Sequence, residues 1–230
     1  MYDILSIIPE SIAFLGPARR WLGIFFVFMR RVISFIDGFN LYHSLDENPK
    51  LHKNKWLSLR ALTEQFLTTN EKLIDVYYFT AYSPWISDSY ARHKIYVKAV
   101  KSENVNVVFG KFSKKWIYCY KCKQTIIKPE EKRTDVNIAL HLLQLAHENA
   151  YDTALIVSGD GDFFPAVELV KTQYKKRVVV IFPINRHRGD LDALADYNDD
   201  IKEHHLNKSR FPDNITLASG KEITCPDSWK

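Results

Sequence analysis

The feature that most constrains the fold of this 230-residue chain is a regular alternation of short apolar runs with amphipathic segments. The apolar runs are rich in β-branched and aromatic residues and lie at 32–37, 74–80, 105–110, 153–158 and 177–182. Helical spacing of apolar residues marks the segments between or beside them, at 58–67, 88–101, 134–149 and 163–174. Strands that alternate with helices are joined by right-handed crossovers. The sequence therefore predicts an α/β protein with a mainly parallel central sheet flanked by helices.

The composition is that of one globular domain with an extension at each end. Hydrophobic residues make up 46% of the chain and charged residues 26%, which excludes a disordered or collagen-like protein. Three cysteines are too few for a disulfide framework. We expect a domain over residues 29–205 that contains a basic insert at 111–133, followed by a loose C-terminal tail at 206–230, where the periodicity fades.

Residues 1–28 read differently from the rest of the chain. The apolar run at 21–29 (WLGIFFVFM) is about half of the ~20 residues that span a bilayer, and no positive n-region precedes it as in a signal peptide. A membrane-surface anchor stays open as one explanation. We favour the other: a weakly ordered or non-native segment upstream of a true start at Met29. On this view the protein is cytoplasmic, without stable membrane insertion.

Four carboxylates lie where the predicted strands end. Asp37 ends the first strand, and Asp160 and Asp162 follow the fourth. Asp135 lies in the first turn of the third predicted helix, with Thr134 as its expected N-cap. Ligands of open parallel sheets bind beyond the carboxyl ends of the strands. We therefore expect these side chains to converge on one edge.

Convergence of carboxylates has a chemical meaning. Two like charges about 5 Å apart repel by roughly 3 kcal/mol at an effective dielectric constant near 20, so such a cluster calls for a cation. Oxygen ligands suit Mg²⁺ or Mn²⁺, which can activate water and neutralise charge on a phosphodiester. Each acid alone has a structural explanation as a helix cap, a partner of a helix dipole or a turn residue. All four at one edge favour a metal site.

Three segments resemble the motifs of NYN domains, a group of PIN-like nucleases. They are Phe35–Leu41 (FIDGFNL), Glu131–Ala139 (EKRTDVNIA) and Leu155–Phe163 (LIVSGDGDF), and they occur in the order that is usual for the family. The resemblance covers roughly residues 30–200. It implies a Rossmann-like PIN-type fold and hydrolysis of RNA that depends on Mg²⁺ or Mn²⁺.

The resemblance also implies roles for individual residues. Asp37 and Asp160 would bind the metal directly, and Asp135 and Asp162 would complete its shell or position the attacking water. Asn40 would orient that water or a phosphate.

Further residues have supporting roles in the resemblance. Ser158 would support the loop that carries Asp160, with Thr134 supporting the helix that carries Asp135. The family often has a later acid, and here its place is taken by Asp196 in the segment Ala195–Tyr197, where Tyr replaces the usual Phe.

The net charge of +5 is unevenly spread. Residues 111–133 hold eight basic and two acidic residues, a net charge of +6, with aromatic residues interleaved. Residues 171–188 add six basic residues and no acid. Basic residues bind phosphates and aromatic rings stack on bases, so we predict RNA as a partner, although a solvated surface would have the same composition. The candidate RNA contacts are Lys114, Lys115, Trp116, Lys121, Lys123, Arg133, Arg186 and Arg188.

Cys119 and Cys122 have the spacing of half a structural zinc site. NYN-like proteins can carry a Cys pair in this insert. Zn²⁺ held with two further ligands, or shared across a dimer, stays open beside two free thiols at a hairpin turn. A homodimer also stays open, because PIN-like domains commonly dimerise.

Two other functions compete with the nuclease as explanations of these motifs. A haloacid-dehalogenase-like phosphatase needs a second Asp two residues after the first, and Phe39 occupies that place. A non-catalytic RNA-binding or regulatory adaptor on the same fold stays open. The sequence therefore favours a metal-dependent endoribonuclease, with the adaptor as the alternative.

Overall fold

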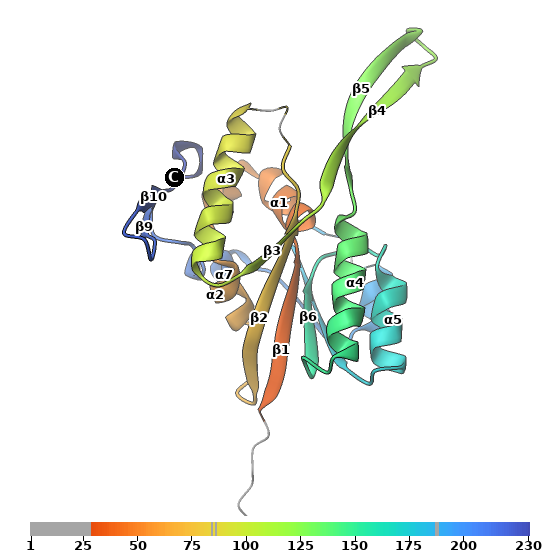
Figure 1. The fold of residues 1–230 in the computed structure, drawn as a ribbon, viewed down its shortest axis with the longest axis vertical. Coiled ribbons are helices and arrows are strands. Elements are labelled where there is room, and N and C mark those ends of the chain that lie inside the picture. The colour runs from red at the N-terminus through yellow and green to blue at the C-terminus, as the bar shows by residue number, and fades with distance from the viewer. Residues whose placement is uncertain (1–28, 84, 86, 187–188) are drawn as a thin grey trace, which may run out of the picture.

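The computed structural model describes residues 29–83, 85, 87–186 and 189–230 (Figure 1). The expectations for residues 1–28 and for Arg188 fall outside these ranges. A six-stranded sheet with the order β3-β2-β1-β6-β7-β8 forms the centre, and every neighbouring pair in it is parallel. Its strands are β1 Arg30–Asp37, β2 Glu71–Thr80, β3 Asn106–Phe109, β6 Thr153–Val157, β7 Arg177–Phe182 and β8 Tyr197–Asp200. The predicted α/β class with a mainly parallel sheet is confirmed.

Strand β1 lies in the middle of the sheet, and four of its central residues, Val32, Ile33, Phe35 and Ile36, are apolar. Its residues from Val32 to Asp37 are buried, as expected for a parallel strand that is covered on both faces. It pairs with β2 on one side and with β6 on the other. Successive side chains point to opposite faces, so Phe35 belongs to one core and Ile36 to the other.

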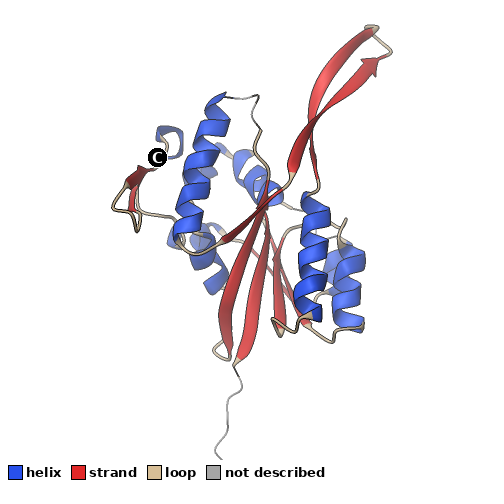
Figure 2. Cartoon of the chain, in the orientation of Figure 1, coloured by secondary structure: helices blue, strands red, loops and turns tan. Residues whose placement is uncertain are grey.

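Helices cover both faces of the sheet (Figure 2). Residues of α1, α2, α3 and α7 share the core that contains Ile36, whereas residues of α4, α5 and α6 share the core that contains Phe35. The bounds are α1 Gly38–Asp46, α2 Leu59–Glu64, α3 Ser87–Ser102, α4 Thr134–His147, α5 Phe164–Thr172, α6 Asp190–Leu194 and α7 Glu203–Lys208, with 3-10 turns at Pro49–Lys55 and Asp227–Trp229. Within the described part of the chain, every helix is too short or too polar to cross a bilayer.

The basic insert forms an antiparallel hairpin of β4 (Lys111–Cys119) and β5 (Gln124–Lys132). These two strands pair with each other and not with the central sheet. The hairpin leaves the sheet after β3 and projects from the body before the chain enters α4 (Figure 1). We call it the arm.

The C-terminal segment is packed on the domain, so the expectation of a loose tail at 206–230 is wrong. Strands β9 (Asn214–Thr216) and β10 (Glu222–Thr224) form a short hairpin. Phe211, Ile223 and Trp229 are 5%, 7% and 6% exposed and belong to the same core as α3. The Trp56 indole N–H donates to the carbonyl of Pro212 at 2.8 Å. These apolar residues of the C-terminal segment pack against the helices and complete this core.

Replacing Trp229 by Ala should therefore destabilise the whole domain. Loss of a buried Trp costs about 3 kcal/mol in the free energy of unfolding, whereas Trp116→Ala, at a residue that is 68% exposed on the arm, should change it by less than about 0.5 kcal/mol. Urea denaturation of the two variants and the parent measures the difference. Equal stability of the two variants would contradict the docked C-terminus.

Candidate metal centre

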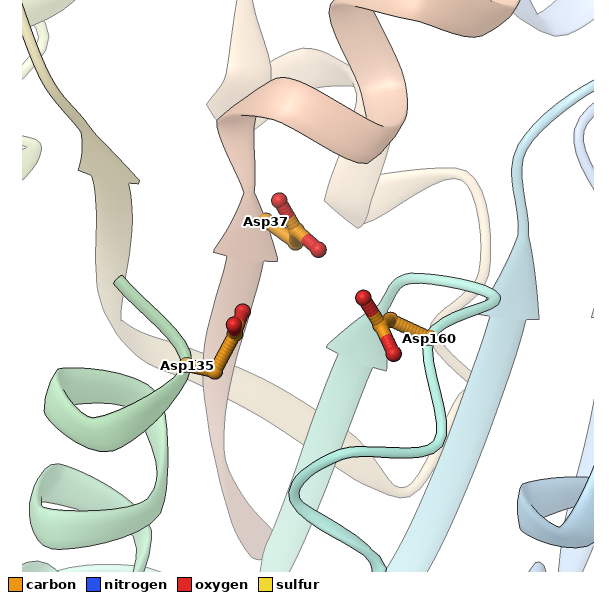
Figure 3. Close-up of side chains that lie close together, drawn as sticks. All are labelled: Asp37, Asp135 and Asp160. Carbon is orange, nitrogen blue, oxygen red and sulfur yellow. The ribbon is translucent and has the colours of Figure 1, made fainter. Parts of the chain in front are cut away.

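Three carboxylates meet beyond the carboxyl ends of β1 and β6. Asp37 ends β1, Asp160 follows β6, and Asp135 lies in the first turn of α4. One oxygen from each lies within 4.8 Å of the other two. Figure 3 shows the three side chains pointing toward one another from these separate elements. The three-Asp cluster could bind a divalent metal.

Hydrogen bonds fix Asp37 in place. Its Oδ1 accepts from the backbone N–H groups of Phe39 at 3.1 Å and Asn40 at 3.0 Å, which caps α1. Its Oδ2 accepts from the Ser158 hydroxyl at 2.9 Å. Glycine is required next to it, because a Cβ on Gly38 would lie 2.5 Å from the carbonyl oxygen of Phe79. The first motif thus places a buried carboxylate between a strand and a helix.

Two further contacts tie the Asp160 loop to this carboxylate. The Ser158 hydroxyl accepts from the Asp160 N–H at 3.0 Å while it donates to Asp37. The side-chain oxygen of Asn40 accepts from the Gly159 N–H at 3.0 Å. Ser158 therefore lies where it can support the loop, as the resemblance implies. Asn40 uses its carbonyl oxygen to hold the same loop, which makes it a positioning residue.

The turn into α4 differs from the expectation. Thr134 is the first helical residue and not the N-cap, and Arg133 precedes it with φ of 83°. The Glu131 carboxylate accepts from the N–H of Thr134 at 3.1 Å and from its hydroxyl, so Glu131 takes the capping role. Gly110 leaves room for this contact, because a Cβ there would lie 2.5 Å from Oε1 of Glu131.

Glu131 was missed as a residue that positions Asp135. The usable signal was its place three residues before Thr134, within the segment that resembles the second motif. A carboxylate just before a helix can satisfy the free N–H groups of the first turn even when it lies outside the N-cap position.

The electrostatics of the cluster favour a bound cation. Burial raises the pKa of Asp37, although hydrogen bonds from Asn40 and Ser158 oppose the shift. Burial, followed by the charges of Asp37 and Asp160, raises the pKa of Asp135 to about 6. Among the described residues, no Lys, Arg or His forms a salt bridge with these carboxylates. An all-oxygen donor set without a protein cation fits a hard divalent ion.

The other predicted acids lie in different surroundings. Asp162 is exposed beside the cluster, where its N–H donates to Asp160 at 3.1 Å and its charge acts on Asp135. Asp196 is not part of the site, which corrects its inclusion in the acidic set. It accepts from the Val178 N–H at 2.7 Å and pairs with Lys171 at 2.8 Å. Val178 lies near the start of β7, so Asp196 is at the amino ends of the strands, opposite the cluster.

Most of the predicted RNA contacts lie on the arm. Lys114, Lys115 and Trp116 belong to β4, and Lys121 and Lys123 lie in its turn. Residues two apart share one face of a strand, so Phe112, Lys114 and Trp116 face the same way. The Phe112 ring meets the Phe39 ring edge-on at 5.6 Å between centroids. This face of the arm is therefore continuous with the start of α1.

Among the described residues, two of the predicted arginines lie outside the arm and have different positions. Arg133 lies between β5 and α4, two residues from Asp135. Arg186 follows β7 and pairs with Glu47 at 2.8 Å, which neutralises part of its charge.

The Cys pair lies at the exposed turn of the arm. Hydrogen bonds from the Cys122 and Lys121 backbones lower the pKa of Cys119, which favours the thiolate that metals bind. Among the described residues, the only cluster of three or more acidic, His or Cys ligands is the Asp trio. The part of the chain that the structure describes therefore supplies no third ligand at the turn, and Zn²⁺ there stays a prediction.

A parallel sheet of this order, with carboxylates gathered at the ends of its central strands, is consistent with a PIN-like fold. The model of the NYN domain family matches residues 31–202. The chain belongs to the NYN domain family of the PIN-like nuclease superfamily.

Two comparisons place the chain among known proteins. It is 30% identical over 109 residues to 6-hydroxy-3-succinoylpyridine 3-monooxygenase HspA of Pseudomonas putida; the match covers 44% of this chain but 34% of that protein. The chain thus spans about a third of the length of this relative. The fold is similar to a crystal structure of a protein of unknown function from Vibrio parahaemolyticus, with a TM-score of 0.51 and 19% identity, over 76% of this chain and 95% of that one.

The raised pKa of Asp135 predicts a pH-dependent cost to the metal-free fold. The carboxyl has a folded pKa of about 6 and an unfolded pKa of about 3.9, so its contribution to stability is present below pH 4 and is lost as the pH rises through 6. Asp135→Asn should stabilise the metal-free protein by about 1 kcal/mol at pH 8, because solvent screens a half-exposed carboxyl, and by nothing near pH 4. Thermal unfolding should show a rise of about 2–4 °C at pH 8.

Asp227→Asn is the control for this measurement, because Asp227 is an exposed acid in the C-terminal 3-10 turn and is paired with Lys230. Equal melting temperatures of the parent and Asp135→Asn at pH 8 in chelator would contradict the electrostatic cost.

Proposed function

We propose that this protein is an endoribonuclease that hydrolyses RNA phosphodiesters with Mg²⁺ or Mn²⁺. The observation that supports it most is the trio of Asp37, Asp135 and Asp160, with oxygens within 4.8 Å, in a domain of the NYN family. Three carboxylates this close are a cost to the fold unless a cation binds them. The function explains why the chain retains them.

The residues of the site divide into those that would hold the ion and those that hold them in place. Asp37, Asp135 and Asp160 would be the ligands, and the ion when bound would supply Lewis-acid stabilisation of the phosphate and a water nucleophile at neutral pH. Ser158 and Asn40 keep the Asp160 loop against Asp37 through the hydrogen bonds described above. Asp162, which is exposed at the rim, would orient water that enters from solvent.

The arm supplies the surface for an RNA strand. Its basic residues would neutralise phosphates, and Trp116, which is 68% exposed, would stack on a base. Because Phe112 on the same face contacts Phe39 of α1, a strand lying along this face would reach the three carboxylates. The negatively charged three-Asp cluster thus lies next to the positively charged surface of the arm.

Replacing a ligand should abolish cleavage while RNA binding remains. We expect Asp160→Asn to lower the rate on single-stranded RNA in Mn²⁺ by at least about 100-fold, more than the ~10–100-fold loss typical of a supporting contact. Asp227→Asn changes the same group at an exposed position in the C-terminal 3-10 turn, outside the three-Asp cluster, and should leave the rate unchanged. Gel analysis of a labelled oligoribonucleotide, with Mn²⁺, Mg²⁺ or chelator, measures the rates.

The outcomes of this assay separate the candidate functions. Cleavage that persists in chelator or in Asp160→Asn would overturn the metal-dependent mechanism. RNA binding without cleavage in either metal would instead support the non-catalytic adaptor on the same fold.

RNA binding should weaken with salt in proportion to the phosphates that the arm contacts. For single strands the logarithm of affinity falls with the logarithm of salt concentration by about 0.7 per neutralised phosphate. Replacing Lys114 and Lys115 together by Ala should therefore reduce the slope by about 1.4. Lys72 and Lys98 are exposed on β2 and α3, and their double Ala variant is the matched control, with an unchanged slope. Equal slopes for the two variants would contradict binding along the arm.

A further inference from the structure

A mostly apolar pocket of about 100 Å³ adjoins the candidate metal centre. It lies between α1, the end of β2, α3 and the base of β4. Its nearest lining residues, Gly38 and Phe39, directly follow Asp37 in the chain. Whatever occupies the pocket therefore lies next to a group bound at the carboxylates.

Aromatic rings form much of its wall. Phe39 and Tyr42 come from α1, Tyr90 from α3, and Phe112 from the arm. The Phe39 and Phe112 rings are held edge to face, with an angle of 80° between their planes. Rings placed in this way present flat apolar surfaces on which a planar ligand can stack.

A few polar groups converge on the same space. His93 lies 3.1 Å from the Thr80 hydroxyl through Nε2, and burial lowers its pKa to about 4, so the ring is neutral and Nδ1 is the nitrogen left for a ligand. The Lys55 ammonium lies over the Tyr42 ring at 5.2 Å and is paired with Asp46, so this side chain, which is only 5% exposed, holds the Tyr42 wall of the pocket. Ser89 adds a hydroxyl from α3. An apolar pocket with a small number of placed polar groups is typical of a site that orients a ligand.

We propose that this pocket binds one nucleobase of the RNA strand whose phosphodiester lies at the carboxylates. The volume is smaller than the ~300–1,000 Å³ of pockets that enclose larger ligands, so it suits a single ring system. Aromatic walls and mixed donors and acceptors match the faces and edges of an unstacked base. The proposal rests on the proposed nuclease function, and it adds that one base, held in the pocket, decides which bond of the strand is cut.

Tetraribonucleotides that each carry one abasic ribose test the pocket through binding. In the Asp160→Asn protein, where cleavage is removed, we expect the abasic position that faces the pocket to weaken equilibrium binding by about 10-fold, within the range for loss of one stacked base. Ser89→Trp should fill the pocket and remove this position-dependent effect. Ala91→Trp, which adds the same ring to the exposed side of α3, should retain it. Phe112→Ala removes one wall and serves as the second test if Ser89→Trp does not fold.

The parent protein, assayed on the same strands with Mn²⁺, distinguishes this proposal from the nuclease proposal. If an abasic ribose weakens binding equally at all four positions, the proposed base-binding role of the pocket is overturned. The same follows if the position-dependent loss of affinity persists in both Ser89→Trp and Phe112→Ala, or if the protein does not bind RNA. A position-dependent effect on binding without cleavage by the parent supports the pocket and overturns the nuclease. Cleavage by the parent without a position-dependent effect on binding supports the nuclease and overturns the base-binding pocket.

Discussion

The site depends on the register in which β1 pairs with β6. Phe35 lies opposite Ile156 and Ile36 opposite Val157, so the next residues, Asp37 and Ser158, emerge together at the sheet edge. A slip of one residue would turn the buried side chains of β1 to the other face and separate the carboxylate from the hydroxyl. Apolar packing on both faces of β1 fixes this register. The hydrophobic cores thereby set the geometry of a polar site that they do not contain.

Carboxylates at the two ends of the sheet differ in their ion pairing. At the amino ends, Asp152 pairs with Arg31 at 2.8 Å and Glu71 with Arg177 at 2.9 Å. At the carboxyl ends, the described basic residues form no salt bridge with the three carboxylates of the candidate metal centre. The paired acids at the amino ends thus stabilise the fold, whereas burial and mutual repulsion make the three unpaired carboxylates destabilising. Clusters held at such a cost are characteristic of functional sites.

The sequence predicted the sheet and the meeting of the acids because both follow from local patterns. Buried parallel strands are apolar runs, and an acid at the end of such a run lies at the ligand-binding edge. Asp196 was assigned to the site from the family resemblance and not from this pattern, and the structure places it just before β8, which begins at Tyr197. The prediction that Thr134 is the N-cap of α4 was wrong, because the Glu131 side chain accepts the hydrogen bond from the first turn of this helix.

The docked C-terminus and the aromatic pocket had no local signal at all. Phe211, Ile223 and Trp229 follow no helical or strand period, so only the three-dimensional contacts show that they belong to a core. The pocket draws its walls from α1, α3, β2 and the arm, which lie far apart in the chain. Such features arise from tertiary packing, and no periodicity within one segment encodes them.

The arm has a consequence for how proteins of this design can diversify. Because β4 and β5 pair with each other and not with the central sheet, the exposed residues toward the turn contact neither of the two cores. Substitutions there are nearly free of folding constraints, whereas those around Asp37 are bound by packing on every side. A new binding preference could therefore arise in the arm without disturbing the packing that holds the three carboxylates at the sheet edge.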